Sequence, residues 1–271
     1  MSLHRRALLQ LAAAAGMAVP VTARAAQRQS LADPFRLAVD EALVESGLAT
    51  HLQRRFGRDT GVAMRVQPGP ARELLEALGR GEYDGALLNT PQAEEVLDQQ
   101  GLLRGRQPVA MSEFLIVGPT LLRPALDALG AQAQVVSALS ALAKAGAPFI
   151  GAKPGSGTHE LESVLWRTAK VAPLPPWYRP SASRDALTAA HEGRGCALVE
   201  RGVWAAASAV LRRDRDFGVL VEGDPMLRVP VHLMRAFHHD HPAGKLLGDW
   251  LASRAGRQAM AALPAYRPLA P

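Results

Sequence analysis

Residues 149–166 read FIGAKPGSGTHELESVLW, in which a short apolar run is followed by a loop of small residues and then by a helical pattern. Apolar residues at the spacing of one helix face are Leu161, Val164, Leu165 and Ala169. Backbone N–H groups at the start of a helix lack partners within it and carry a partial positive charge, so they attract oxyanions. The stretch predicts a strand, a loop and a helix, and the loop is interpreted either as an anion-binding loop or as a tight connection.

Strand-like and helix-like patterns alternate on both sides of this unit. Short apolar runs predict strands at 35–39, 62–66, 84–89, 108–119, 196–200, 217–222 and 229–234. Helical spacing predicts helices at 44–56, 71–78, 91–100, 184–192, 201–211 and 245–262. This alternation is typical of an α/β fold with parallel-rich sheets flanked by helices. The run at 108–119 is long enough to leave one lobe and enter another.

The composition is that of a soluble globular protein, with 48% hydrophobic and 21% charged residues among 271. The formal net charge of +6 falls to about +3 when the basic residues of the first 25 positions are set aside. The remaining Lys and Arg are interspersed with acidic residues, which argues against nucleic-acid binding. The single cysteine, Cys196, excludes an intrachain disulfide and a cysteine metal cluster, and we expect it to pack as a small buried side chain.

The first 25 residues have the pattern of an export signal. Arg5 and Arg6 precede an apolar middle that is too short to span a membrane, and Ala23-Arg24-Ala25 fits an A-x-A cleavage site. The arginine pair and the mildly hydrophobic middle favour twin-arginine export, although paired arginines also occur in general secretory signals. No cysteine follows the cleavage site to take a lipid anchor. We expect a periplasmic chain with no membrane insertion after signal cleavage.

Two further motifs suggest chemistry and also have simpler interpretations. The run HHDH at 238–241 groups residues that bind metals, but an exposed polar loop is the favoured interpretation. Ser156 lacks the flanking glycines of a hydrolase nucleophile elbow, and His159 is expected to be a polar residue in the first turn of a helix. No set of nucleophile, base and acid stands out. We therefore expect a binding protein rather than an enzyme, with no metal or cofactor.

Several longer stretches resemble the periplasmic tungstate-binding proteins of ABC importers, a branch of the molybdate and tungstate solute-binding group. The matching stretches are RRFGRDTGVAMRV, GRGEYDGALLNTPQAEEVL, SEFLIVGP, ALAKAGAPFI, SGTHELESVLW, ALVERGVWAA and LVEGDP, spread over residues 36–260. The resemblance implies a two-lobed, type II-like solute-binding protein with two crossing strands and a ligand in the cleft. The expected boundaries are a signal peptide at 1–25, lobe 1 at 26–112, lobe 2 at 113–229 and a return to lobe 1 at 230–271.

The same resemblance and the strand ends suggest ligand-binding positions on both sides of the cleft. The candidate residues, in chain order, are Asp40, Glu41, Asn89, Thr90, Lys153, Ser156, Gly157, Thr158 and Arg184. Several of them have an ordinary alternative role. Lys153 is equally a solvated loop charge, Arg184 a surface residue in a first helical turn, and Asn89-Thr90 a cap before Pro91.

The chain departs from the family pattern where the anion would bind. After the first strand the family carries three threonines and a serine, whereas this chain reads Val39-Asp40-Glu41-Ala42, and Ala152 stands where the family has an arginine. Carboxylates beside a desolvated dianion repel it strongly. We expect Asp40 and Glu41 to project toward the mouth of the cleft, where they disfavour bare tungstate or molybdate. An equally open interpretation is that they select a cationic or zwitterionic ligand.

Two function classes remain open from the sequence. The first is a periplasmic solute-binding protein whose lobes close on a small-molecule or oxyanion ligand and present it to an ABC permease. The second is a binding-fold protein without transport, which acts as a ligand sensor or a periplasmic accessory protein after losing oxyanion specificity. In both classes we expect the chain to be a monomer.

Overall fold

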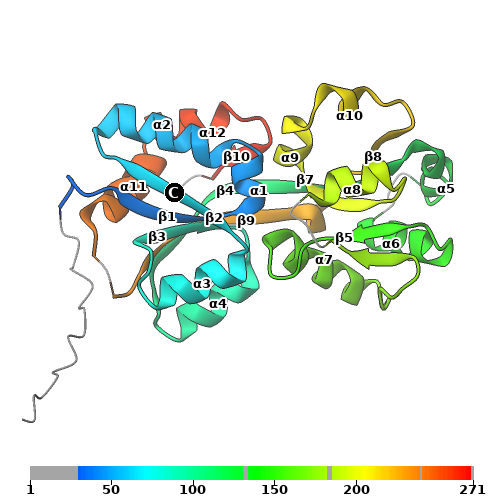
Figure 1. Ribbon diagram of the computed structural model, residues 1–271, viewed down its shortest axis with the longest axis horizontal. Coiled ribbons are helices and arrows are strands. Elements are labelled where there is room, and N and C mark those ends of the chain that lie inside the picture. The colour runs from blue at the N-terminus through cyan, green and yellow to red at the C-terminus, as the bar shows by residue number, and fades with distance from the viewer. Residues whose placement is uncertain (1–29, 131–133, 182–184, 239, 270–271) are drawn as a thin grey trace, which may run out of the picture.

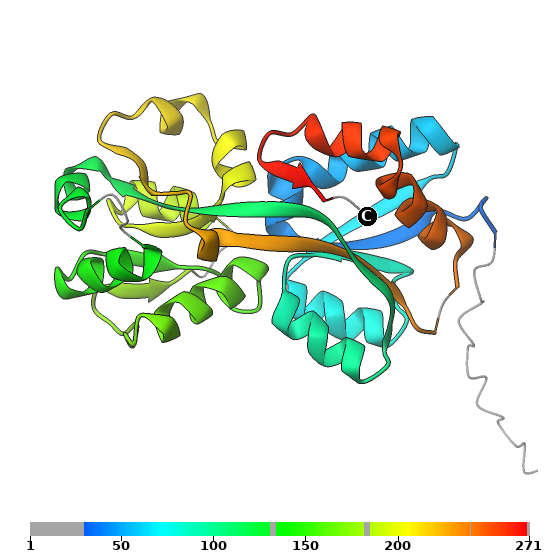
Figure 2. The same ribbon diagram turned by 180° about the vertical axis from the view of Figure 1, so that it is seen from behind.

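The computed structural model describes residues 30–130, 134–181, 185–238 and 240–269, which form two α/β lobes side by side (Figure 1). The elements of lobe 1 are β1 (Phe35–Asp40), α1 (Glu41–Glu45), α2 (Leu48–Thr60), β2 (Met64–Gly69), α3 (Ala71–Gly79), β3 (Gly85–Leu88), α4 (Pro91–Gln99), α11 (Pro242–Ala252), α12 (Arg254–Ala261) and β10 (Tyr266–Pro268). The elements of lobe 2 are η1 (Thr120–Leu122), α5 (Arg123–Asp127), α6 (Val135–Lys144), β5 (Phe149–Gly151), α7 (Gly157–Thr168), β6 (Tyr178–Pro180), α8 (Ala186–Glu192), β7 (Ala197–Glu200), α9 (Arg201–Ala206), α10 (Ala209–Arg213), β8 (Phe217–Val221) and η2 (Pro225–Leu227). Two long strands, β4 (Leu103–Pro119) and β9 (Arg228–Ala236), connect the lobes (Figure 2).

The sheet of lobe 1 has the strand order β2-β1-β3-β9-β4-β10. Strand β1 is parallel to β2 and β3, and the other neighbours are antiparallel. Helices cover both faces, with α2, α11 and α12 on one side and α3 and α4 on the other (Figure 1). In β1, Leu37 and Val39 enter one core cluster and Ala38 enters the other, because successive strand side chains point to opposite faces.

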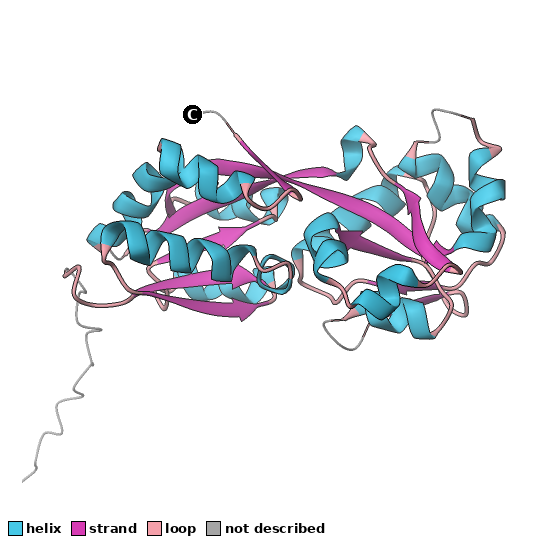
Figure 3. Cartoon of the chain, turned by 90° about the horizontal axis from the view of Figure 1, so that it is seen from above, coloured by secondary structure: helices cyan, strands magenta, loops and turns pink. Residues whose placement is uncertain are grey.

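The sheet of lobe 2 is built on the second half of β4. Strands β7 and β8 both pair antiparallel with it, and β5 pairs parallel with β6. Helices flank the strands of both lobes (Figure 3). Phe114 and Ile116 of β4 pack under α6 and α7, whereas Leu115 and Val117 pack under α8 and α10. One uninterrupted apolar strand can therefore serve two cores, since both of its faces are covered.

Some elements differ from the sequence prediction in where they end. The predicted helix 44–56 is two helices, because Gly47 adopts a left-handed φ of +82°. The predicted helix 245–262 is divided at Ser253, whose hydroxyl accepts a hydrogen bond from Gly256 N and caps α12. The predicted helix 201–211 is divided in the same way at Ser208, which caps α10. Each break removes a few helical residues and leaves the alternation of strands and helices intact.

Two predictions about single residues have clear outcomes. Cys196 is buried, as expected, and burial raises the pKa of its thiol to about 12. The exposed-loop interpretation of 238–241 is wrong for His241, which is buried and accepts a hydrogen bond from Ala243 N at the start of α11. His239 lies outside the described residues. Among the residues that are described, no group of three or more metal-binding side chains is found, and no helix has the length and apolarity of a membrane span.

Candidate ligand-binding cleft

Asp40 is the last residue of β1, and its carboxylate contacts two helices. Its Oδ1 accepts a hydrogen bond from Ala42 N at 3.0 Å and caps α1, as aspartate commonly does where a strand leads directly into a helix. Its Oδ2 accepts a hydrogen bond at 3.0 Å from the N–H of Gly157, the first residue of α7 in the other lobe. The side chain is 0% exposed. A carboxylate of lobe 1 thus lies at a helix N-terminus of lobe 2, which is an anion-binding position.

The loop between β5 and α7 is held in place by the buried Glu162. Glu162 Oε2 accepts a hydrogen bond from Ala152 N at 2.7 Å. Its Oε1 accepts hydrogen bonds from Trp166 Nε1 at 3.1 Å and from the Tyr178 hydroxyl at 2.8 Å. Burial raises the pKa of Glu162, and these hydrogen bonds oppose that rise. The loop is therefore fixed to lobe 2 before it reaches the cleft.

Two further contacts of this loop cross to lobe 1. Gly155 has a φ of +85°, which glycine adopts without strain, and its carbonyl accepts a hydrogen bond from Arg72 N at 3.0 Å. Lys153 Nζ lies 3.3 Å from Glu41 Oε1, and the Glu41 side chain is only 8% exposed. Such a partly buried ion pair is screened less by salt than a surface pair. The lobes thus meet directly at the ends of β1 and β2.

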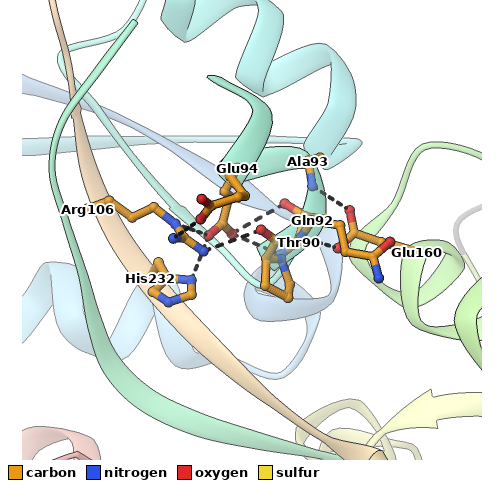
Figure 4. Close-up of polar contacts among 9 residues, drawn as sticks. Thr90, Gln92, Ala93, Glu94, Arg106, Glu160 and His232 are labelled. Atoms are coloured by element: carbon orange, nitrogen blue, oxygen red, sulfur yellow. Dashed lines mark hydrogen bonds and ion pairs between the residues drawn. The ribbon is translucent and has the colours of Figure 1, made fainter. Parts of the chain in front are cut away.

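A second carboxylate crosses the cleft in the opposite direction. Glu160 of α7 accepts hydrogen bonds from Gln92 N at 2.9 Å and Ala93 N at 3.1 Å, in the first turn of α4 (Figure 4). Burial raises the pKa of Glu160, and the two hydrogen bonds oppose the rise. Helices α7 and α4 thus each receive a carboxylate from the opposite lobe at the end where negative charge is favourable.

Glu94 connects the start of α4 to both of the strands that join the lobes. Its Oε1 accepts a hydrogen bond from Thr90 N at 2.9 Å, and its Oε2 accepts one from Arg106 Nε of β4 at 3.1 Å (Figure 4). His232 Nδ1 of β9 lies 2.6 Å from the same Oε2. Glu94 is 0% exposed. The end of β3, the start of α4 and the connecting strands therefore form one polar unit beside the cleft.

A cavity of about 50 Å³ lies beside Asp40, several times the roughly 10–15 Å³ that admits one water molecule. Its charged and hydroxyl-bearing lining residues are Asp40, Glu41, Glu45, Lys153, Ser156, Thr158, Asp185 and Glu200. Sequence reasoning missed Glu45, Asp185 and Glu200. Glu200 ends β7 as Asp40 ends β1, so the rule that ligands bind at the carboxyl ends of strands would have found it.

The electrostatics of this cavity are dominated by carboxylates. Burial raises the pKa of Asp40 from 3.8 to about 6, against the opposing hydrogen bonds from Gly157 and Ala42. Burial also raises the pKa of Glu200 from 4.5 to about 7, against opposing hydrogen bonds that include one from the Ser112 hydroxyl. Among the described residues, Lys153 is the cationic side chain that lines the cavity. An additional anion would therefore enter an already negative environment.

The other candidate residues have defined local roles. Ser156 Oγ accepts a hydrogen bond from His159 N at 3.1 Å and donates one to the Lys153 carbonyl at 2.8 Å, so it is the N-cap of α7. Thr90 is the N-cap residue of α4 and does not line the cavity. Asn89 lies against Gly157, and its buried amide makes no hydrogen bond to the described part of the chain. Arg184 lies outside the described residues, and a ligand-binding role for any candidate remains a prediction.

The expected position of Asp40 and Glu41 needs a correction. Both were predicted to project toward the mouth of the cleft, but Asp40 is 0% exposed and Glu41 is 6% exposed. The physical reason is that the lobes meet at these residues. From the opposite lobe, Gly157 N donates a hydrogen bond to Asp40, and the Lys153 ammonium donates one to Glu41.

Two α/β lobes joined by two long strands, with a polar cavity lined from both lobes, define a two-lobed solute-binding protein. Within that class, the chain is similar to proteins named for tungstate binding and transport by ABC importers. No protein-family model matches the chain.

The similarity extends over most of the chain. The tungstate-binding protein TupA of Peptoclostridium acidaminophilum is 28% identical over 229 residues, which are 80% of this chain and 77% of the relative. The solved structure of the tungstate ABC transporter from Geobacter sulfurreducens matches at 25% identity with a TM-score of 0.74, over 85% of this chain and 98% of that chain. TupA from Desulfovibrio alaskensis matches at 23% identity with a TM-score of 0.71, over 88% of this chain and 100% of that chain, and this likeness shows the fold.

Proposed function

We propose that this chain is the solute-binding component of an ABC importer and that its lobes close on a small ligand in the cleft between β1 and α7. The main support for this proposal is the cavity beside Asp40, whose lining comes from both lobes and includes the carboxyl ends of β1 and β7. Ligands of open α/β sheets bind at such strand ends. The similarity to proteins named for tungstate binding supports the same role, and we propose binding rather than catalysis.

We also propose that the chain works in the periplasm as a monomer and presents its ligand to a permease. The support for this location is the signal-like segment at 1–25, with the pair Arg5-Arg6, which lies outside the described residues. Cell fractionation with an epitope-tagged chain tests the location. Recovery of the full-length chain in the cytoplasm alone would contradict it.

A thermal-shift screen of the purified mature protein tests the binding function. The panel contains oxyanions, amino acids, amines and divalent cations, each at millimolar concentration. A ligand at 100 times its Kd adds about 2.7 kcal/mol to the free energy of unfolding, so we expect at least one class to raise Tm by about 5–10 °C. The shift should change in Lys153→Ala, which removes a lining cation: it shrinks for an anionic ligand and grows for a cationic one. It should persist unchanged in Lys144→Ala, which changes an exposed lysine of α6. If no class of ligand raises the Tm of the wild type, the proposal is contradicted.

A further inference from the structure

The first N–H of α7 already has an anionic partner, and that partner comes from within the protein. Gly157 N donates to Asp40 Oδ2 at 3.0 Å, from a helix of 12 residues. The next capping requirement is met locally, because Ser156 Oγ accepts from His159 N. Beside this pair, the amide of Asn89 is buried at 1% exposure and has no hydrogen-bond partner among the described residues. The start of α7 is therefore built as an anion-binding position, and a carboxylate fills it.

We propose that Asp40 is a tethered anion that sets the specificity of the cleft: its carboxylate takes the position at the start of α7 that a free oxyanion needs, so the wild-type protein excludes bare tungstate, molybdate and sulfate. The inference rests on the proposed function, since it treats the cleft as the ligand site. It concerns which class of ligand the cleft admits.

The energetic argument is electrostatic. An oxyanion bonded to Gly157 N would lie close to the Asp40 carboxylate, and two like charges 4 Å apart repel by about 4 kcal/mol at an effective dielectric constant of about 20. That energy corresponds to roughly a thousandfold loss of affinity for each unit charge. Glu41 and Glu200, which line the same cavity, add to the repulsion. Lys153 offsets part of it, but its ammonium is already paired with Glu41.

A purely local role for Asp40 does not explain the second contact. Capping of α1 needs one acceptor, and Asp40 Oδ1 supplies it to Ala42 N. Serine caps helices about as well as aspartate does. The bond from Gly157 N to Oδ2 is a separate contact that only a side chain with a second acceptor can make. Comparison of aspartate with serine at this position therefore separates the two roles.

The test is calorimetric titration with tungstate, molybdate and sulfate at pH 7.5. We expect the wild type to bind none of them at millimolar concentration. Asp40→Ser keeps the cap of α1 and frees Gly157 N, so its affinity for one or more of these anions should rise at least about 100-fold. This gain is smaller than the roughly thousandfold loss that the repulsion of one unit charge implies. Glu41→Gln is the matched comparator, because it removes one negative charge from the same cavity and leaves the Asp40–Gly157 bond in place. Its gain should be clearly smaller than that of Asp40→Ser, because Gly157 N stays occupied by the Asp40 carboxylate.

Three outcomes overturn the inference. They are micromolar tungstate binding by the wild type, an equal gain in Glu41→Gln, and a folded Asp40→Ser that binds none of the three anions. Circular dichroism checks folding, and Asp40→Asn, which keeps the size and removes the charge, serves as the second variant. A wild type that responds to another class of ligand while Asp40→Ser ignores oxyanions contradicts the inference alone. Silence of both proteins toward every ligand contradicts the proposed function as well.

Discussion

Asp40 shows how one residue can carry several properties of this molecule. The same carboxyl ends β1, caps α1, accepts a hydrogen bond from α7 and lines the cavity. Burial raises its pKa from 3.8 to about 6, so the folded protein binds this proton more tightly than the unfolded chain does. Protonation therefore stabilises the fold, and the contribution is lost as pH rises through the window from about 4 to 6.

We predict that ionisation of Asp40 lowers the free energy of unfolding of the wild type as pH rises, and that the Asp40→Asn variant lacks this loss. Between pH 4.5 and 7.5, the contribution of Asp40 to the free energy of unfolding should fall by about 2 kcal/mol. Urea denaturation at both pH values measures it as the difference between the wild type and Asp40→Asn. Asp98→Asn, which changes an exposed carboxyl of α4, is the control and should keep the wild-type dependence. Equal pH dependence in all three proteins would show the prediction to be wrong.

At the residue scale, the sequence singled out Asp40 and Glu41 but did not predict how deeply they are buried. Asp40 and Glu41 stand out because they depart from the pattern of the family that the sequence resembles, and both line the cavity. Their burial could not be read from the sequence, because it depends on contacts with Gly157 and Lys153, more than 100 residues away. Glu200 was missed because a single acidic residue after an apolar strand has no distinctive local pattern.

At the scale of elements, α4 is positioned by a buried carboxylate that belongs to a polar network. Glu94 is 0% exposed, and its carboxylate accepts hydrogen bonds from Thr90 N and Arg106 and lies 2.6 Å from His232 Nδ1. Its neighbour Glu95 is 51% exposed and contacts the same Arg106 at 3.1 Å. We predict that Glu94→Gln lowers the free energy of unfolding by about 3 kcal/mol, since it breaks a buried ion pair. Glu95→Gln should cost less than about 1 kcal/mol, as surface pairs do. Urea denaturation of the two variants decides it, and equal losses would contradict the role of burial.

The elements themselves could be predicted to different degrees. The apolar run at 108–119 predicted the crossing strand β4 because both of its faces are buried in lobe 2. The breaks at Gly47 and Ser253 were missed because single small residues are tolerated inside helices and act as caps only in context. The three-residue strands β6 and β10 were also missed. Each exists only through its pairing with β5 or β4, which no local pattern reveals.

At the scale of the whole molecule, the central feature is direct contact between the lobes through groups that the protein itself supplies. Asp40 reaches α7 from lobe 1, and Glu160 reaches α4 from lobe 2. Gly157 lies at the contact, where an added Cβ would overlap the side-chain oxygen of Asn89. Alanine suits a helix, so Gly157→Ala should leave α7 intact while it keeps the lobes apart.

Small-angle X-ray scattering of the ligand-free protein tests this closure most directly. We predict that the wild type scatters as the compact two-lobed structure does, and that Gly157→Ala has a larger radius of gyration at nearly unchanged secondary structure by circular dichroism. Gly218→Ala, in which the added Cβ meets no atom closer than 3.7 Å and the backbone is not left-handed, controls for substitution of a glycine in lobe 2. A ligand-free wild type as extended as Gly157→Ala would contradict closure of the lobes by Asp40, Glu160 and their partners.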